Sequence, residues 1–154
     1  MKKVLDVAIL LAALGFVMFV GIKSVKGDEL HEHPTIVAMR AENNAMRAVK
    51  GLPAQTLSPE LTKASQDHAN YMARTGRLTH YSNGGPAGRC KRYGYKGSAA
   101  ENIAMGQKSI REVFRDWKRS RGHYRNMMGR AKVVGFGCAR SARGSLFFVA
   151  MYGF

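Results

Sequence analysis

The segment LTKASQDHANYMARTGRLTH, residues 61–80, is the most informative part of the sequence because it predicts a long amphipathic helix that leads directly into a turn carrying a histidine. Ser58 is a suitable N-cap, Pro59 suits the first helical position, and Gly76 is a natural stop. Apolar and small residues recur at helical spacing on one face of this segment. His68 lies on that face, so we interpret it as a hydrogen-bonded core residue and not as a ligand.

On either side of this helix, the sequence predicts two more helices and a terminal hairpin. Apolar residues at helical intervals indicate a helix at 35–49, and the capping box of Ser109 and Glu112 begins another at 110–119. The other predicted segments are a long loop at 79–99, a shorter turn around His123, and strands at 133–139 and 146–152. Helices that flank an antiparallel sheet define an α+β domain.

The N-terminal segment predicts export. Two lysines at the start precede Val7–Ile22, a run without charge, and two more lysines follow it. This run is long for a signal-peptide core and short for a spanning helix, so both a cleaved signal peptide and a membrane anchor at 4–22 stay open. In both cases the rest of the chain is expected to be extracytoplasmic, either secreted or anchored with the domain outside. The expected organisation is 1–27 for this segment, 28–34 for a linker and 35–154 for the folded domain.

The two cysteines gain a possible role from export. In an oxidising compartment Cys90 and Cys138 can pair, and closing that loop would stabilise the fold by about 4 kcal/mol in the chain-entropy model. The alternative is two independent thiols, with Cys138 packed inside a strand. We expect the disulfide, conditional on export.

Positive charge is concentrated in the second half of the domain. Residues 28–88 hold six basic and six acidic side chains, whereas residues 89–143 hold fifteen basic and three acidic ones, a net charge of +12. This excess predicts an anionic partner, either an envelope polymer or a membrane surface, although a merely solvated face would look the same. Nucleic acid is disfavoured because export separates the domain from it. The predicted patch consists of Arg89, Lys91, Arg92, Arg115, Lys118, Arg119, Arg121 and Arg125.

His80, Glu101 and His123 are the best candidates for a chemical site. Each lies in a distinctive short stretch, LTHYSNGG, AAENIAMG and SRGHYRNMM, and the spacing places them on separate elements. Imidazole and carboxylate groups bind first-row metals or transfer protons near neutral pH. His31 and His33 form an H-x-H in the linker, which we interpret as a solvated segment that could bind a metal adventitiously.

The order of these motifs resembles the CAP superfamily, also called the SCP, cysteine-rich secretory protein or pathogenesis-related-1 domain, in its bacterial type. The resemblance covers about residues 35–154. It is carried by L-x-x-A-S-x-x-H-A-x-x-M-A-x-x-G-x-L-x-H at 61–80, AENIA-x-G at 100–106, a tryptophan helix followed by GHYRNMM at 122–128, VGFGCA at 134–139 and FFVAMYG at 147–153. It implies a three-layer α-β-α sandwich with a central antiparallel sheet and a cleft lined by two histidines and two glutamates.

Within this resemblance, His80 and His123 correspond to the family histidines and Glu101 to the first glutamate. Ser120 stands where the second glutamate is expected, and a serine hydroxyl is neither a carboxylate base nor an ordinary zinc ligand. Ser120 and Asn126 are expected to line the cleft. The implied cofactor is zinc or another divalent metal held by the two histidines, and Glu101 would orient a histidine or polarise a metal-bound water.

Several functions remain open from the sequence. The first is an exported cleft protein that binds a metal, with or without a further ligand, and acts at the cell envelope, and this interpretation leaves catalysis open. The second is a metal-assisted hydrolase of peptide or cell-wall bonds with Glu101 as a catalytic general base, which the serine at 120 weakens. The third is a basic module for anionic envelope polymers or lipids. A buried hydrogen-bonded cluster without a ligand is the structural alternative, and we expect a monomer in each case.

Overall fold

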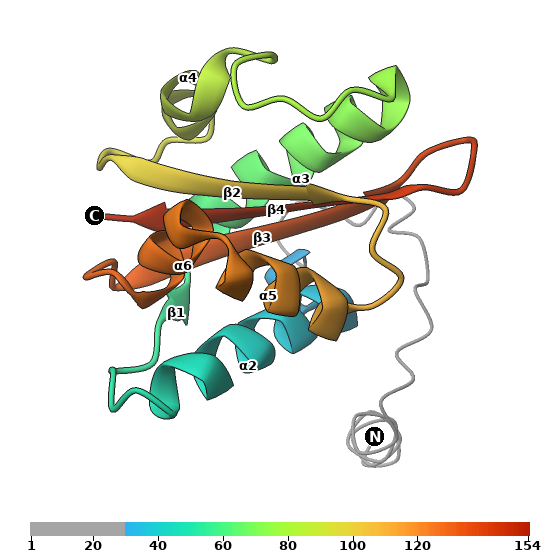
Figure 1. Ribbon diagram of the computed structural model, residues 1–154. Coiled ribbons are helices and arrows are strands. Elements are labelled where there is room, and N and C mark those ends of the chain that lie inside the picture. The colour runs from blue at the N-terminus through green and yellow to red at the C-terminus, as the bar shows by residue number, and fades with distance from the viewer. Residues whose placement is uncertain (1–29) are drawn as a thin grey trace, which may run out of the picture.

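The computed structural model describes residues 30–154, in which helices precede and separate the first strands and two strands end the chain (Figure 1). The helical elements are the 3-10 turn η1 (Leu30–Glu32), α2 (Pro34–Ala48), α3 (Pro59–Thr75), α4 (Gly85–Arg92), α5 (Ile110–Arg119) and α6 (Arg121–Met128). The strands are β1 (Thr56–Leu57), β2 (Ala99–Met105), β3 (Val133–Arg140) and β4 (Leu146–Gly153). The export segment expected at 1–27, including the possible anchor at 4–22, lies outside the described residues and stays a prediction.

The sheet has the strand order β1-β3-β4-β2. β4 pairs antiparallel with both β3 and β2, and the short β1 pairs parallel with β3. Every residue of β4 is buried, as expected for a central strand covered on both faces. β2 forms an edge of the sheet, so one side of its backbone is open to side chains from elsewhere in the fold.

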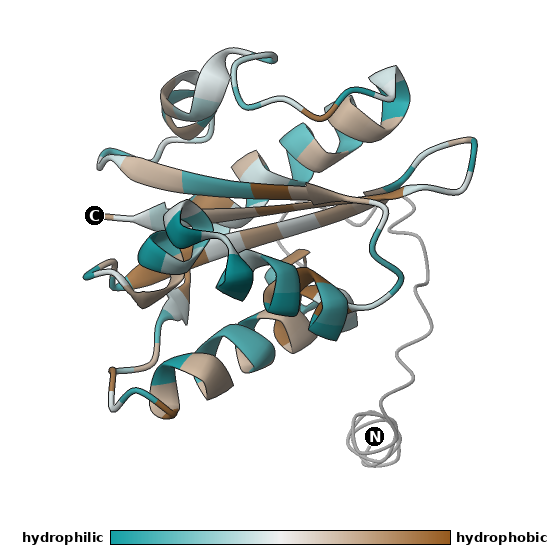
Figure 2. Ribbon diagram, in the orientation of Figure 1, coloured by the Kyte–Doolittle hydropathy of each residue, from teal (hydrophilic) through white to brown (hydrophobic). Residues whose placement is uncertain are grey.

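Helices cover both faces of the sheet, which confirms the predicted α-β-α sandwich (Figure 1). α2, α5 and α6 pack on one face around Ile36, Phe114, Trp117, Phe136 and Phe148. α3 and α4 pack on the other face around Leu61, Met72, Cys90, Val149 and Met151. Figure 2 shows the hydrophobic colours concentrated on the strands and the hydrophilic ones on α5 and α6. Within residues 30–154, no helix is long and apolar enough to cross a membrane.

Two glycines of β3 allow α3 to approach the sheet closely. Val134, Phe136 and Cys138 point into the layer of α2 and α5, and the alternate positions Gly135 and Gly137 face α3. A Cβ atom at either glycine would overlap with backbone atoms of α3. The VGFGCA motif is therefore explained by packing, because only a residue without a side chain fits at this contact.

The helices expected at 35–49, 58–76 and 110–119 and the terminal hairpin are confirmed to within a residue or two. The loop expected at 79–99 is partly wrong, because it contains α4. Asn83, Gly84 and Gly85, the first residue of this short helix, are left-handed, with φ of 54°, 84° and 66°. The helix also lacks an apolar stripe that would have revealed it. The turn expected around His123 is the helix α6, and strands β1 and β2 were not anticipated.

The predicted disulfide is wrong. Cys90 and Cys138 are both free and buried. Cys90 packs in the layer of α3 and α4, whereas Cys138 packs in the layer of α2 and α5, so the sheet separates the two sulfur atoms. A disulfide requires Cα atoms within about 7 Å and Cβ atoms that point toward each other, which this arrangement excludes.

Candidate functional site

The candidate site lies along the edge strand β2, where Glu101 and Asn102 are neighbours. Successive residues of a strand point to opposite faces, so Glu101 faces the layer of α3 and α4, and Asn102 faces the layer of α5 and α6. Each of these two side chains is buried and contacts a segment that carries one of the site histidines. The strand edge thus brings together the two halves of the site.

On the first face, Glu101 joins a histidine to an arginine. Its Oε1 accepts a hydrogen bond from His80 Nδ1 at 2.9 Å, and its Oε2 accepts one from Arg89 Nη2 at 2.5 Å. The Glu101 side chain is 1% exposed, whereas that of His80 is 38% exposed. Because Nδ1 donates to the carboxylate, the His80 ring presents Nε2 as its free nitrogen.

Arg89 does not belong to the exposed anionic-partner patch in which the sequence placed it. Its side chain is fully buried, and its guanidinium donates to the Ser82 and His80 carbonyls as well as to Glu101. A buried charge is costly unless it is paired, which explains why the guanidinium and carboxylate lie together. No signal in the sequence distinguishes this arginine from the exposed basic residues around it.

The backbone next to His80 is held by a second buried group. His68 Nε2 donates to the Thr79 carbonyl oxygen at 2.8 Å. Burial lowers the pKa of His68 and so favours a neutral ring, although the hydrogen bond to Thr79 acts in the opposite direction. His68 is thus a hydrogen-bonded core residue, as its place on the helical stripe predicted, and it supports the turn that carries His80.

On the second face, amide side chains fasten α6 to the strand edge. Asn102 Nδ2 donates to the His123 carbonyl at 3.1 Å, and Asn126 Nδ2 donates to Asn102 Oδ1 at 2.9 Å and to the Glu101 carbonyl at 3.4 Å. The His123 ring lies edge-on to Trp117, with 6.4 Å between ring centroids. Asn126 therefore attaches α6 to the edge of β2. Asn102 was not predicted from the sequence, although its place beside Glu101 on a strand is a signal that could have identified it.

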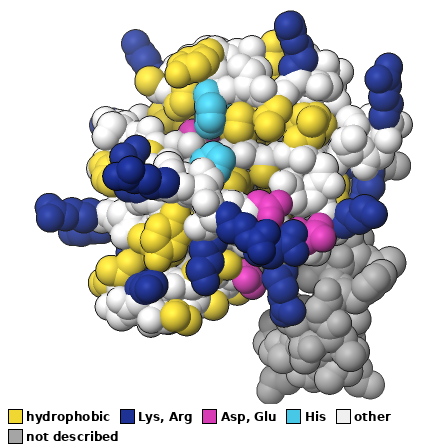
Figure 3. All heavy atoms as spheres, in the orientation of Figure 1, with side chains coloured by type: hydrophobic (Ala, Val, Ile, Leu, Met, Phe, Trp, Pro, Cys, Tyr) yellow, Lys and Arg dark blue, Asp and Glu magenta, His cyan; other side chains and the backbone are white. Residues whose placement is uncertain are grey.

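Two effects lower the pKa of His123. The larger is burial, and the positive charge of a protonated His80 adds to it. Figure 3 shows two histidine rings at the surface of one face, with hydrophobic side chains beside them. The lowered pKa favours a neutral His123 ring near neutral pH, which is the form that can accept a proton or bind a metal.

Ser120 joins α5 to α6 and leaves the site without a second carboxylate. It is half-buried, and its backbone nitrogen donates to the Trp117 carbonyl while its carbonyl accepts from Tyr124. Its side chain makes no capping hydrogen bond to α6. Residues 30–154 contain no group of three or more histidine, cysteine, aspartate or glutamate side chains arranged to hold a metal. The donor set that remains is the pair of imidazoles.

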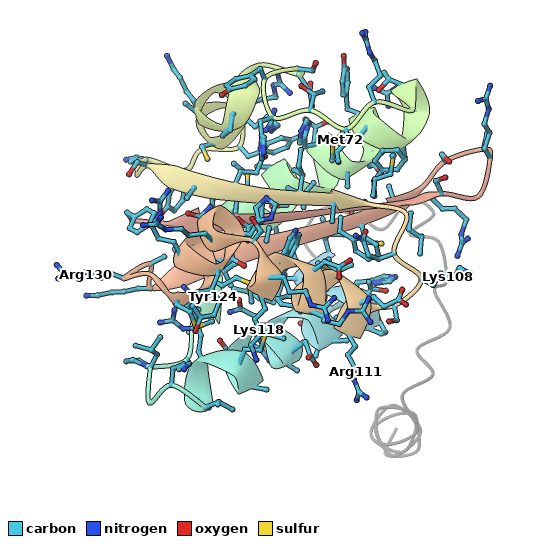
Figure 4. The ribbon with its side chains drawn as sticks, viewed as in Figure 1. Met72, Lys108, Arg111, Lys118, Tyr124 and Arg130 are labelled. Carbon is cyan, nitrogen blue, oxygen red and sulfur yellow. The ribbon has the colours of Figure 1, made fainter. Side chains whose placement is uncertain are left out.

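The predicted basic patch is divided between the two outer layers. Lys91 and Arg92 are exposed on α4, where Arg92 pairs with Asp67 at 2.9 Å. The exposed basic side chains of α5 and α6 lie on the other side of the sheet and are Arg111, Arg115, Lys118, Arg119, Arg121 and Arg125. Figure 4 shows Arg111 and Arg130 extending away from the body of the molecule.

Comparisons with known proteins agree with the fold and the motifs. Residues 41–152 match the family described as the cysteine-rich secretory protein family, or CAP. Over 89 residues the chain is 35% identical to the uncharacterized protein YkwD of Bacillus subtilis, a match that covers 55% of this chain. The match spans only 34% of the length of that curated relative.

Two solved structures share the fold at low sequence identity. An outer surface protein of Borrelia burgdorferi has a TM-score of 0.74 at 18% identity, covering 87% of this chain and 98% of that one. An extracellular protein containing an SCP domain from Bacillus anthracis has a TM-score of 0.68 at 17% identity, covering 86% of this chain and 45% of that one. Since the family match extends over most of the folded domain and the sandwich is that of these structures, the chain belongs to the cysteine-rich secretory protein (CAP) family.

Proposed function

We propose that this protein is an extracytoplasmic CAP protein that binds a divalent metal ion, such as zinc, through His80 and His123. The observation that carries the proposal is the hydrogen bond between His80 Nδ1 and Glu101, which leaves Nε2 without this partner on a side chain that is 38% exposed. Histidines that bind metals commonly donate their other ring nitrogen to a carboxylate, which fixes the tautomer and the ring orientation. The edge of β2 supplies this arrangement for His80.

His123 is the second proposed ligand. Its lowered pKa favours the neutral ring, and the structure shows no hydrogen bond from its ring nitrogens to another described residue. A site with two protein ligands leaves the remaining positions to water, so its affinity is expected to be modest and to fall at acidic pH. A bound divalent ion would supply Lewis acidity to those waters.

The geometry supports an orienting role for Glu101 and not that of a general base. Both carboxylate oxygens are engaged, one by His80 and one by Arg89, and the side chain is 1% exposed. A general base must reach the proton that it removes, directly or through one water. For this reason we prefer a metal-binding protein to the metal-assisted hydrolase that the family resemblance also allows.

Export of the domain is part of the proposal. It rests on the charged and apolar pattern of residues 1–27 and on the family, one of whose members, from Bacillus anthracis, is described as an extracellular protein. Protease accessibility of the domain in intact cells would test it, with a cytoplasmic protein as the control. If the domain stays fully protected from protease in cells stripped of their outer layers but with an intact cytoplasmic membrane, export is contradicted.

Isothermal titration of the purified full-length protein with zinc tests the metal site. The protein should be kept in mild detergent because of the apolar run at 7–22. We expect binding by the wild type and its loss in a variant that carries both His80→Ala and His123→Ala. The matched control carries His31→Ala and His33→Ala, which removes the H-x-H near the N-terminus and should leave binding intact. No binding by the wild type, or equal binding by the first variant, would contradict the proposal.

A second candidate function is binding to an anionic envelope polymer, because six basic side chains on α5 and α6 are all exposed. Inorganic polyphosphate serves as the probe, and we expect binding at low salt that weakens as salt rises. The test variant reverses Lys118, Arg119, Arg121 and Arg125 to glutamate. The control variant makes the same change in charge elsewhere, at Arg74, Arg77, Arg140 and Arg143. Equal loss in both variants, or salt-insensitive binding, would rule out a localised surface.

A further inference from the structure

The geometry points to Arg89 as a positioning residue of the histidine site, and we propose that it sets the tautomer and orientation of His80 through Glu101. The inference rests on the proposed metal function and extends it to a residue that touches neither the metal nor solvent. Arg89 Nη2 donates to Glu101 Oε2, and the other oxygen of this carboxylate accepts from His80 Nδ1. The three side chains form a continuous chain from the buried side of α4 to the partly exposed ring of His80.

Arg89 holds His80 at two points. Its Nη2 donates to the His80 carbonyl at 3.2 Å, and through Glu101 it also fixes the position of the ring. Its Nη1 donates to the Ser82 carbonyl at 2.7 Å, two residues further along the same turn. Every acceptor of this guanidinium is therefore either the carboxylate that orients His80 or the backbone that carries it. A residue that only stabilised α4 would have no reason to direct all its bonds to this turn.

The burial of Arg89 and Glu101 keeps water from disturbing the orientation of His80. The side chains of Arg89 and Glu101 are 0% and 1% exposed, so water cannot replace either partner. Guanidinium and carboxylate groups form strong charge-assisted hydrogen bonds of fixed geometry. With Oε2 occupied by Arg89, only Oε1 is directed at the histidine, and a carboxylate oxygen requires a donor there. His80 consequently carries its proton on Nδ1 and presents the lone pair of Nε2.

Without Arg89, the proton of the His80 ring should no longer be confined to Nδ1. Glu101 would then lie buried without its counter-charge and free to rotate, and the turn would lose two of its anchors, the bonds to the Ser82 and His80 carbonyls. A rotated carboxylate would no longer accept from His80 Nδ1, so the ring would be free to turn and to carry its proton on Nε2, the nitrogen that the proposed metal site uses. Loss of partners that orient a metal ligand typically weakens metal affinity by about 10–100-fold.

The test compares full-length wild type with Arg89→Met, Arg89→Lys and the control Arg92→Met, which alters an exposed arginine on the same helix. Nitrogen-15 NMR of the metal-free protein reports which ring nitrogen of His80 carries the proton. We expect a protonated Nδ1 in the wild type and the control, a mixed or reversed state in Arg89→Met, and partial recovery in Arg89→Lys. Zinc affinity should fall about 10–100-fold in Arg89→Met, less in Arg89→Lys, and not in the control.

The outcomes separate this inference from the proposed function. If the wild type binds no zinc, the metal function fails, while the NMR measurement still tests the role of Arg89. A wild-type His80 that carries its proton on Nε2 would overturn the inference even if no Arg89 variant folded. A folded Arg89→Met or Arg89→Lys variant with the wild-type tautomer would overturn it as well. An affinity loss without any tautomer change would assign Arg89 a purely structural role and would also contradict the inference.

Discussion

The buried pair of Arg89 and Glu101 gives the sharpest prediction about stability. Replacement of Glu101 by leucine leaves a fully buried guanidinium without its counter-charge, and replacement of Arg89 by methionine leaves a buried carboxylate in the same condition. Breaking a buried pair in this way costs about 3–5 kcal/mol of unfolding free energy. Because neither side chain reaches solvent, no screening by water reduces this estimate.

The double variant should be more stable than either single variant. With Glu101→Leu and Arg89→Met together, both charges are gone, and an apolar pair of similar volume occupies the space. What remains is the loss of donors to the Ser82 and His80 carbonyls, which costs about 1–3 kcal/mol. The three variants should therefore rank with the double variant closest to the wild type.

Urea unfolding followed by far-UV circular dichroism measures these differences on the full-length chain. Two-state analysis should give similar slopes for all four proteins, so that differences in midpoint report differences in stability. A control pair, Arg92→Met with Asp67→Leu, removes an ion pair at the surface and should change stability by about 1 kcal/mol or less. Additive losses in the double variant, or single losses as small as those of the control, would refute the reasoning.

Three further predictions follow from packing and burial. Gly137→Ala should lower the unfolding free energy by about 1–3 kcal/mol because its Cβ atom would overlap with the backbone of α3, whereas Gly122→Ala, which has open space, should be neutral or slightly stabilising. Stability should fall as pH drops below about 6.5, because His68 and His123 have lowered pKa values, so the unfolded chain binds more protons than the folded one. Burial raises the pKa of the Cys138 thiol to about 12, so thiol reagents should react with it only after unfolding, and non-reducing mass spectrometry should detect two free thiols.

Each of these predictions has a clear contrary outcome. Equal urea midpoints for the two glycine variants would mean that α3 moves freely away from the sheet. A stability that rises on acidification through pH 6.5 would show that the buried histidines are not the groups that control it. A protein mass that reveals a cystine would mean that the two cysteines do not lie on opposite faces of the sheet.

Local patterns in the sequence were sufficient for most of the secondary structure. Ser58 with Pro59 and Ser109 with Glu112 mark helix starts, and the structure places the first residues of α3 and α5 directly after their caps. The terminal hairpin follows from two β-rich runs around a turn. The helix α4 escaped detection because it is short, begins at three left-handed residues and carries no apolar stripe.

Local patterns of the chain were enough to predict the α+β class and the family, which are confirmed, and to single out His80, Glu101 and His123 as candidates, because caps, periodicity and motif order are local properties. Which distant side chains meet became clear only from the packing of the layers. This packing buried Arg89 against Glu101, placed Asn102 against α6 and separated the two cysteines by the sheet. Charge and residue type are properties of single positions in the sequence, whereas the burial and pairing of a side chain depend on how the layers pack.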